Sequence, residues 1–218
     1  MTDSIRRPGV HPSAADAAAL LGRSIDLTQF RLAGGTALAW HLGHRVSVDL
    51  DFFSFTPGTL DPAPAAELAD VLQGIDPAGG PFDLGERTIH GRIGACHVSF
   101  FQVEGEWFDP PVRVAERIDL ATVPELAAMK LVAVMTRCAK KDFYDLVAIA
   151  ESGLTLSDML AGARRMYAGF DQALPHLRRS VVYFDEAEVD PDPFSMTGIT
   201  WPDVKRRMEA LARGFDRL

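Results

Sequence analysis

The sequence predicts an α+β fold, in which a mixed sheet with flanking helices is followed by a C-terminal helical bundle. Between residues 30 and 121, apolar and polar residues alternate with a period of two in several segments separated by Gly and Pro. From Pro124 onward the apolar spacing becomes helical. We therefore expect two domains in the 218 residues, an α/β domain over 1–122 and a helical domain over 123–218.

The elements are predicted from caps, breaks and periodicity. The first domain should contain a helix that Ser13 caps and that ends near Leu21, strands over 30–33 and 45–55 on either side of a helix over 36–42, a helix over 65–72, a hairpin of strands over 84–90 and 92–103 that turns near Gly91, and short strands over 112–114 and 118–121. The second should contain helices over 124–137, 142–152, 156–169, 174–183 and 202–214, with a surface loop over 185–200.

Composition narrows the class of protein. Hydrophobic residues make up 47% and charged residues 24%, and no apolar run is long enough to span a bilayer, so we expect no membrane partner. Cys96 and Cys138 indicate neither a disulfide framework nor a zinc cage, which favours a reducing cytoplasm.

The formal net charge of −8 argues against a protein that coats nucleic acid nonspecifically, but it leaves room for a local basic cleft. Basic residues gather in the last third, where we interpret them as a solvated helix face. They are Arg164, Arg165, Arg178, Arg179, Lys205, Arg206, Arg207, Arg213 and Arg217.

Two carboxylates lie in the predicted strand over 45–55. Because side chains two apart share a face, Ser47, Asp49 and Asp51 should lie together, with Val46, Val48, Leu50 and Phe52 facing the core. Neighbouring carboxylates repel each other, and a Mg²⁺ ion between them would remove that repulsion. Such a pair with Mg²⁺ supports phosphoryl or nucleotidyl transfer, although an Asp-x-Asp motif alone is also typical of an edge strand that faces water.

A glycine pair precedes this strand. Gly34 and Gly35 follow a predicted strand and precede a helix, an arrangement whose backbone N–H groups suit phosphate oxygens, and Thr36 adds a hydroxyl. An isolated Gly-Gly is more typical of a tight turn or a helix cap. The ordered combination of glycine turn, short helix and acidic strand is more specific than any part.

These residues resemble a known family. Gly34-Gly35 followed by Asp49-x-Asp51 is similar to the signature of the DNA polymerase β-type nucleotidyltransferases, and GGTALAWHLGHRVSVDLDFFSF resembles the AbiEii/AbiGii toxin family. The resemblance implies an enzyme of the nucleotidyltransferase fold, with an NTP held by Gly34, Gly35, Thr36 and Ser47, and Mg²⁺ held by Asp49 and Asp51. It also implies a toxin–antitoxin or phage-defence role, with a cognate antitoxin as partner and the tRNA 3′ end among the candidate acceptors.

A second stretch, PELAAMKLVAVMTRCAKKDFYDLVAIAE, has a lysine in a helix that is apolar almost all round. Lys130 there needs an anionic partner or a route to solvent, and Arg137 lies near it in angle. We expect a break around 138–140, with Asp142 capping the next helix and Asp145 in its first turn.

By resemblance to the same family, Lys130 would contact the nucleotide phosphates, together with Arg137 or Lys141. Asp142 or Asp145 would orient the lysine or assist the acceptor hydroxyl.

One departure from the superfamily keeps alternatives open. A third carboxylate usually lies on a neighbouring strand, but GACHVSFFQV offers His97 and Ser99 and no acid. We therefore expect one Mg²⁺. A module without catalysis that binds nucleotide or antitoxin, and an enzyme that modifies a small molecule or a protein hydroxyl, remain alternatives.

Overall fold

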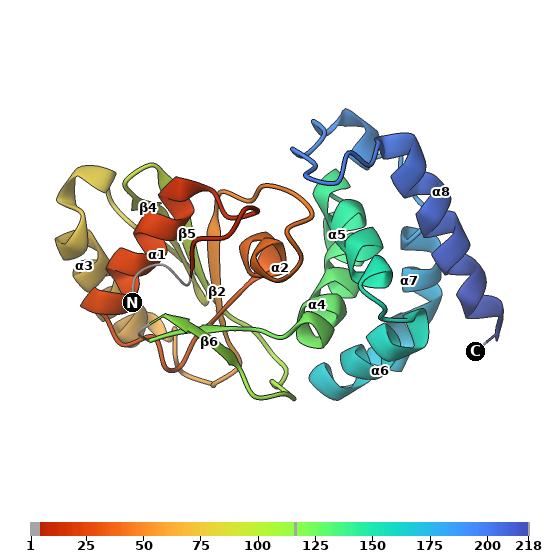
Figure 1. Cartoon of the computed structure of the whole chain (residues 1–218). Helices are drawn as coiled ribbons and strands as arrows, with labels where there is room; N and C mark the ends of the chain where they lie inside the picture. The colour runs from red at the N-terminus through yellow and green to blue at the C-terminus, as the bar shows by residue number, and fades with distance from the viewer. Residues whose placement is uncertain (1–4, 116, 218) are drawn as a thin grey trace. The chain divides into compact units, whose positions relative to one another are not determined.

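The computed structural model describes residues 5–115 and 117–217, and it confirms the α+β class (Figure 1). Within these residues seven strands form one mixed sheet in the order β3-β4-β5-β2-β1-β7-β6. The strands are β1 (Arg31–Ala33), β2 (Leu50–Ser54), β3 (Asp83–Gly85), β4 (Thr88–Ile93), β5 (Cys96–Gln102), β6 (Val112–Ala115) and β7 (Ile118–Leu120). The pairs β2–β5 and β1–β7 are parallel, and the remaining neighbours are antiparallel.

Among the described residues, one α-helix precedes the strands in the sequence, two lie between the first three strands, and the others follow the last strand. The helices are α1 (Pro12–Ser24), α2 (Gly34–Leu42), α3 (Pro62–Ile75), α4 (Val123–Thr136), α5 (Lys140–Glu151), α6 (Leu156–Met166), α7 (Leu174–Ser180) and α8 (Trp201–Ala212). Short 3₁₀ turns occur at Pro77–Gly79, Phe170–Ala173, Ala187–Val189 and Arg213–Arg217.

The chain forms two compact units. The first comprises residues 1–105 and 110–122, and the second comprises 106–109 and 123–218. The short segment 106–109 belongs to the second unit because Glu125, which is fully buried in α4, accepts hydrogen bonds from the backbone N–H groups of Phe108 and Asp109 at 2.9 and 3.1 Å.

The core of the first unit lies beneath strands β2, β4 and β5. Alternate residues of β2 and β5 are buried, including Leu50, Phe52, Val98 and Phe100, and the rings of Phe52 and Phe100 stack at 5.0 Å. Helices α1 and α3 pack over strands β3 to β5, and α2 packs beside β1 and β2 (Figure 1).

In the longer segment of the second unit, the regular elements of the described residues are all helices, joined by turns and loops. Helix α4 packs against α5, α6 and α7, and α8 packs against α5. Aromatic residues fill the space around Trp201, whose ring lies 5.8 Å from Phe143 and 5.7 Å from Phe184.

Some predicted boundaries were wrong. The ladder of β2 begins at Leu50, so residues 45–49 form a loop joined to the N-terminal segment by a bridge between Val10 and Ser47, and Val48 is 47% exposed instead of facing the core. The hairpin turn lies at Gly94 and Ala95, and Gly91 is inside β4, where a Cβ would be only 2.4 Å from the Phe82 ring.

Two predicted caps were also wrong. His11, not Ser13, is the N-cap of α1, and its ring accepts a hydrogen bond from the Ser13 N–H. Helix α5 begins at Lys140, so Asp142 lies inside its first turn and its side chain does not cap the helix. The carboxylate of Asp142 is bonded to cations instead, as described below.

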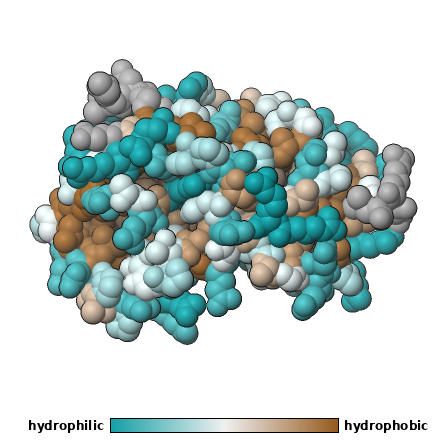
Figure 2. Space-filling view, turned by 90° about the horizontal axis from the view of Figure 1, so that it is seen from below, coloured by the Kyte–Doolittle hydropathy of each residue, from teal (hydrophilic) through white to brown (hydrophobic). Residues whose placement is uncertain are grey.

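Hydrophilic side chains cover much of the face shown in Figure 2, and hydrophobic side chains are visible between them. Among the described residues, no single helix combines the length and apolarity needed to cross a bilayer. Helices α5 and α6 reach that combination only as a pair bent by 114°.

Candidate functional site

The sheet register brings the glycine pair next to the acidic strand. Ala33, the last residue of β1, is paired with Asp51 of β2, and α2 starts directly after it with Gly34 and Gly35. The two predicted parts of the site, 16 positions apart in the sequence from Gly35 to Asp51, are therefore neighbours in the first unit.

Gly34 is required by both its backbone and its surroundings. Its φ of +62° is disfavoured for other residues, and a Cβ there would lie 2.8 Å from Oδ2 of Asp51. The carboxylate of Asp51 thus lies against the backbone at the start of α2. Asp51 is half-buried, so its side chain is held by the fold but still reaches solvent.

Gly35 makes room for a cation. A Cβ at this position would lie 2.4 Å from Nη2 of Arg45 and 3.0 Å from Oγ of Ser47. Arg45 is only 4% exposed, and its Nη1 donates to the carbonyl of Val46 at 3.2 Å. Our sequence interpretation missed Arg45, and the only signal it gave was a basic residue two positions before Ser47.

Thr36 ties the helix to the loop before β2. Its hydroxyl lies 3.0 Å from Oγ of Ser47 and donates to the carbonyl oxygen of Asp49. Both hydroxyl residues are buried, at 1% exposure for Thr36 and 8% for Ser47. These contacts fix the backbone from which Asp49 extends.

The donor set at this position suits a magnesium ion. Asp49 and Asp51 are half-buried, so their oxygens can meet a cation that keeps several waters and phosphate ligands, as Mg²⁺ does. Within the described residues, no group of three or more His, Cys, Asp or Glu side chains is arranged to hold a metal. In β5 the partner of Asp51 is Ser99, so this neighbouring position has no third carboxylate.

Cys96 lies on the opposite face of β5, in the core. Burial first, and then the charges of Asp49 and Asp51, raise the pKa of its thiol to about 12. Burial also raises the pKa of the Cys138 thiol. Both thiols therefore stay protonated near neutral pH, which argues against a cysteine nucleophile.

The second unit contains a buried ionic cluster formed by Lys130, Arg137, Asp142 and Asp145, which we call the α4–α5 cluster. Nζ of Lys130 lies 2.6 Å from Oδ1 of Asp142 and 2.6 Å from Oδ2 of Asp145. Nε and Nη2 of Arg137 each lie 2.7 Å from a different oxygen of Asp142, which gives a bidentate pair. Lys130 is 3% exposed and both aspartates are fully buried.

Charge pairing decides the ionisation of Asp142. Burial acts to raise its pKa, but Lys130 and Arg137 outweigh that effect and hold the pKa below its usual value. Asp142 therefore stays ionised and connects a buried cation to the side chain of Arg137, which is 52% exposed. Arg137 is the member of the α4–α5 cluster that reaches solvent.

The two neighbouring lysines at the start of α5 differ in their exposure to solvent and in their hydrogen bonds. Lys141, the predicted phosphate contact, is exposed. Lys140 is 5% exposed, and its Nζ donates to Oδ1 of Asp192 at 3.0 Å and to the carbonyl of Asp190. Lys140 thus anchors the loop over 185–200 to α5, a role that the sequence interpretation did not assign.

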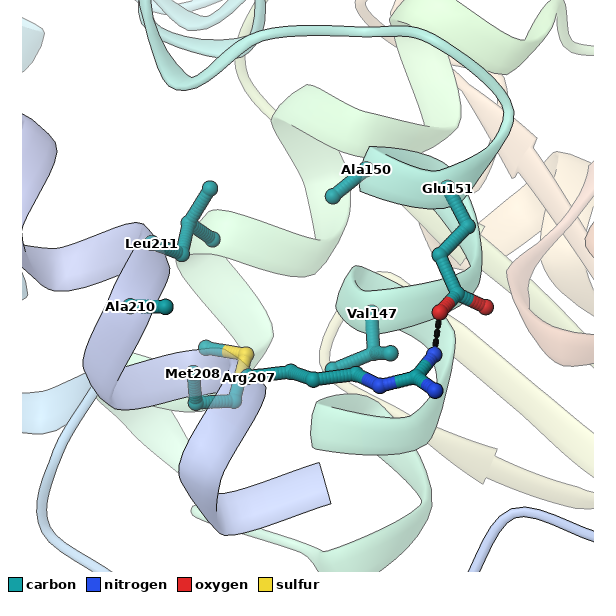
Figure 3. A pocket seen from close by; sticks show the side chains of 7 residues that line it. All are labelled: Val147, Ala150, Glu151, Arg207, Met208, Ala210 and Leu211. Atoms are coloured by element: carbon teal, nitrogen blue, oxygen red, sulfur yellow. Dashed lines mark ion pairs between the residues drawn. The ribbon is translucent and has the colours of Figure 1, made fainter. Parts of the chain in front are cut away.

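A pocket of about 200 Å³ lies between α5 and α8 in the second unit (Figure 3). Its lining is mainly apolar, and Arg207 and Glu151 form an ion pair at its edge. It contains none of the predicted site residues, so we do not assign it to the candidate site.

Comparison with known proteins gives the class and the family. A sequence model of the family described as nucleotidyl transferase AbiEii toxin, type IV toxin–antitoxin system, matches residues 18–218. An uncharacterized protein of Aquifex aeolicus (strain VF5) is 31% identical over 160 residues, which are 72% of this chain and 75% of that protein. MenT4, a nucleotidyltransferase toxin from Mycobacterium tuberculosis H37Rv, covers 93% of this chain with 86% of its own, at 18% identity and a TM-score of 0.49.

By the family match over residues 18–218, the protein is a nucleotidyltransferase. The chain belongs to the AbiEii family of nucleotidyltransferase toxins of type IV toxin–antitoxin systems. The resemblance seen in the sequence is thereby confirmed, and membership implies an NTP substrate and a cognate antitoxin.

Proposed function

We propose that the protein uses Mg²⁺ to transfer a nucleoside monophosphate from an NTP to the 3′-terminal hydroxyl of tRNA. The observation that supports this most directly is the contact of the Asp51 carboxylate with the backbone at Gly34. A carboxylate held against the start of a helix puts a metal ligand beside backbone N–H groups that suit phosphate oxygens.

In this proposal each group of the first unit has one task. Gly34, Gly35 and Thr36 seat the triphosphate, and Ser47 and Thr36 fix the loop that positions Asp49. Asp49 and Asp51 would hold Mg²⁺, which when bound would offset phosphate charge and orient the attacking oxygen. The acceptor oxygen bonds to the α-phosphorus, its proton is lost to solvent, and pyrophosphate leaves with the electron pair of the broken P–O bond.

For the second unit we propose that Arg137 contacts phosphate and that Lys130 acts behind it. Nζ of Lys130 already bonds Asp142 and Asp145, whereas the guanidinium of Arg137 is half exposed. Asp142 would orient Arg137 through the bidentate pair, and Lys141 would add a second, exposed cation. Fixed charges of this kind stabilise charge that develops on transferring phosphates.

The proposal is tested by incubating the protein with each α-labelled NTP, Mg²⁺ and total tRNA. We expect label at the tRNA 3′ end, at least a hundredfold less with Asp49→Asn or Asp51→Asn, and none when EDTA removes the metal. Asp171→Asn, an exposed aspartate of the second unit that pairs with Arg164, is the matched control and should keep full activity. Transfer that persists in both acid variants would contradict the proposal.

The presence of Ser99 beside Asp51 favours a second candidate, a module that binds nucleotide without transferring it. Calorimetry separates the two candidates. NTP binding by a chain that labels no tRNA, protein or small-molecule acceptor would support the module and exclude the enzyme.

A further inference from the structure

We propose that the acceptor RNA strand binds along one surface of strands β4 and β5, formed by His90, Arg92, His97 and Ser99, which we call the β4–β5 strip. This inference rests on the proposed function and locates its acceptor. A single-stranded 3′ end is the occupant to which we commit.

The sheet register places the strip next to the acidic strand. Asp51 is paired with Ser99, and Ser99 is paired with His90, so the three side chains lie in one row on the same face of the sheet. The row spans two strand spacings, about 10 Å. Arg92 is paired with His97, and this pair is two positions further along the same face.

Burial shows that this face meets solvent. His90, Arg92 and His97 are exposed, whereas residues of the same strands that face the other way, such as Ile93 and Val98, are at most 3% exposed. The side chains of the strip are therefore available to a ligand that also reaches Asp51.

The strip is prearranged to meet phosphate. Nη1 of Arg92 lies 2.7 Å from Nε2 of His97, and its Nη2 donates to the carbonyl of Ala95 at 3.0 Å. When His97 accepts the Arg92 bond, its other ring nitrogen carries the proton and is a donor. The remaining N–H groups of Arg92 and this donor suit a phosphodiester, which Arg binds in bidentate fashion.

Aromatic rings continue the same face beyond Ser99. Phe53 of β2 and Phe101 of β5 stack at 4.8 Å, and the His90 ring meets the edge of Phe101 at 5.3 Å. Both phenylalanines are half-buried, so part of each ring remains accessible. Aromatic groups beside cations are typical of surfaces that bind single-stranded nucleic acid.

The charges of the strip favour a polyanionic occupant such as an RNA 3′ end. In a chain of net charge −8, the strip presents Arg92 and two histidines beside the acid pair. Asp83, the β3 partner of His90, is the acidic residue at its far edge. Ser99 and His90, with the His90 ring nitrogen 3.1 Å from the Ser99 hydroxyl, give the terminal ribose hydrogen-bond partners next to Asp51.

The experiment measures RNA binding and transfer separately in the full-length protein. Binding of a fluorescent oligoribonucleotide with the tRNA acceptor-end sequence is followed by anisotropy, NTP binding by calorimetry, and transfer by labelling. In Arg92→Gln with His97→Asn we expect about tenfold weaker RNA binding and a similar rise in the KM for tRNA. NTP affinity should be unchanged.

Two further variants keep the test interpretable. His90→Gln changes an exposed member of the strip without touching the Arg92–His97 pair, and it should raise the KM for tRNA in the same direction. Arg206→Gln removes an exposed arginine of the second unit, paired with Asp203, and should change neither RNA binding nor KM.

Each outcome has a defined consequence. Unchanged RNA affinity in the double variant and in His90→Gln would overturn the strip. Lost NTP binding in these variants would also overturn the proposal, because the strip would then bind the NTP instead of the acceptor RNA. A third outcome is that the unmodified protein shows no transfer, while the double variant Arg92→Gln with His97→Asn still binds RNA more weakly. In that case the strip is supported as an RNA-binding surface and the proposed transfer is contradicted.

Discussion

Two adjacent glycines allow two side chains of opposite charge to approach the backbone closely. Gly34 admits the carboxylate of Asp51, and Gly35 admits the guanidinium of Arg45, each at a distance that a Cβ would not tolerate. The glycine pair is therefore needed for protein groups as well as for any phosphate. It allows an anion and a cation to lie against consecutive backbone positions at the start of α2.

Gly35→Ala, alone and combined with Arg45→Ala, separates the steric effect of a Cβ at position 35 from the effect of the Arg45 charge on NTP binding. The single change forces Arg45 to move, so we expect a lower melting temperature and at least tenfold weaker NTP binding. Removing the Arg45 side chain as well relieves this clash and should recover part of the melting temperature. NTP binding should stay weak, because we propose that the Arg45 guanidinium beside Gly35 adds positive charge where the triphosphate binds. Thermal unfolding and calorimetry measure the two effects.

Gly74→Ala is the matched control for this pair of variants. Gly74 lies inside α3, and a Cβ added there would have no neighbouring atom within 4 Å, so alanine should stabilise the protein by up to about 1 kcal/mol. A double variant that binds NTP as tightly as the unmodified protein would show that Arg45 has no electrostatic role.

At single positions, the sequence predicts which residues can take part in the chemistry of the site better than it predicts which residues are in contact. Asp49, Asp51 and the glycine pair were recognisable because their types and order are unusual. Arg45 was not, because its approach to Gly35 depends on the path of the loop over 45–49, which the alternating pattern presented as a strand.

At the scale of elements, α4 and α5 are joined by their ionic cluster across a tight break. Cys138 has a φ of +46°, which turns the chain so that Asp142 and Asp145 of α5 meet Lys130 of α4. The sequence predicted the break and the angular match of Lys130 with Arg137. It did not predict that both aspartates would face the lysine, because that requires the angle between the helices.

Asp142→Asn should destabilise the protein by about 3–5 kcal/mol, because it leaves Lys130 buried with one anion fewer and releases Arg137. Urea unfolding at pH 7 measures this difference. Asp171→Asn removes an exposed pair with Arg164 and should cost at most about 1 kcal/mol. Equal costs for the two changes would show that the cluster contributes no more than a surface pair.

The same variant has a defined pH dependence. The pKa of folded Asp142 is below its unfolded value, so its stabilising effect is complete above the unfolded pKa and is lost as the pH falls through the lower folded pKa. The difference in unfolding free energy between the unmodified protein and Asp142→Asn should therefore be constant from pH 5 to 7 and shrink below about pH 4. A difference that grows on acidification would contradict the ionised state of Asp142.

At the scale of the whole molecule, the charge distribution limits how RNA can bind. Several basic residues of the last third are paired with acids in the second unit: Arg164 with Asp171, Lys205 with Glu188, Arg206 with Asp203, and Arg207 with Glu151. Arg164, Arg206 and Arg207 are exposed, as the interpretation of a solvated helix face requires, whereas Lys205 is half-buried. Because these C-terminal cations are already paired, the β4–β5 strip is a better candidate for phosphate contacts than they are.

RNA binding should accordingly depend only weakly on salt. For single strands, the slope of log K against log salt is about −0.7 per neutralised phosphate, so one to three contacts give a slope of about −0.7 to −2. Arg92→Gln should make the slope shallower by about 0.7, and Arg206→Gln, whose charge is already paired, should leave it unchanged. Anisotropy titrations of the acceptor-end oligonucleotide at several salt concentrations measure the slope. A slope steeper than about −4 in the unmodified protein would require more phosphate contacts than the β4–β5 strip provides, and would assign RNA binding to a larger basic surface.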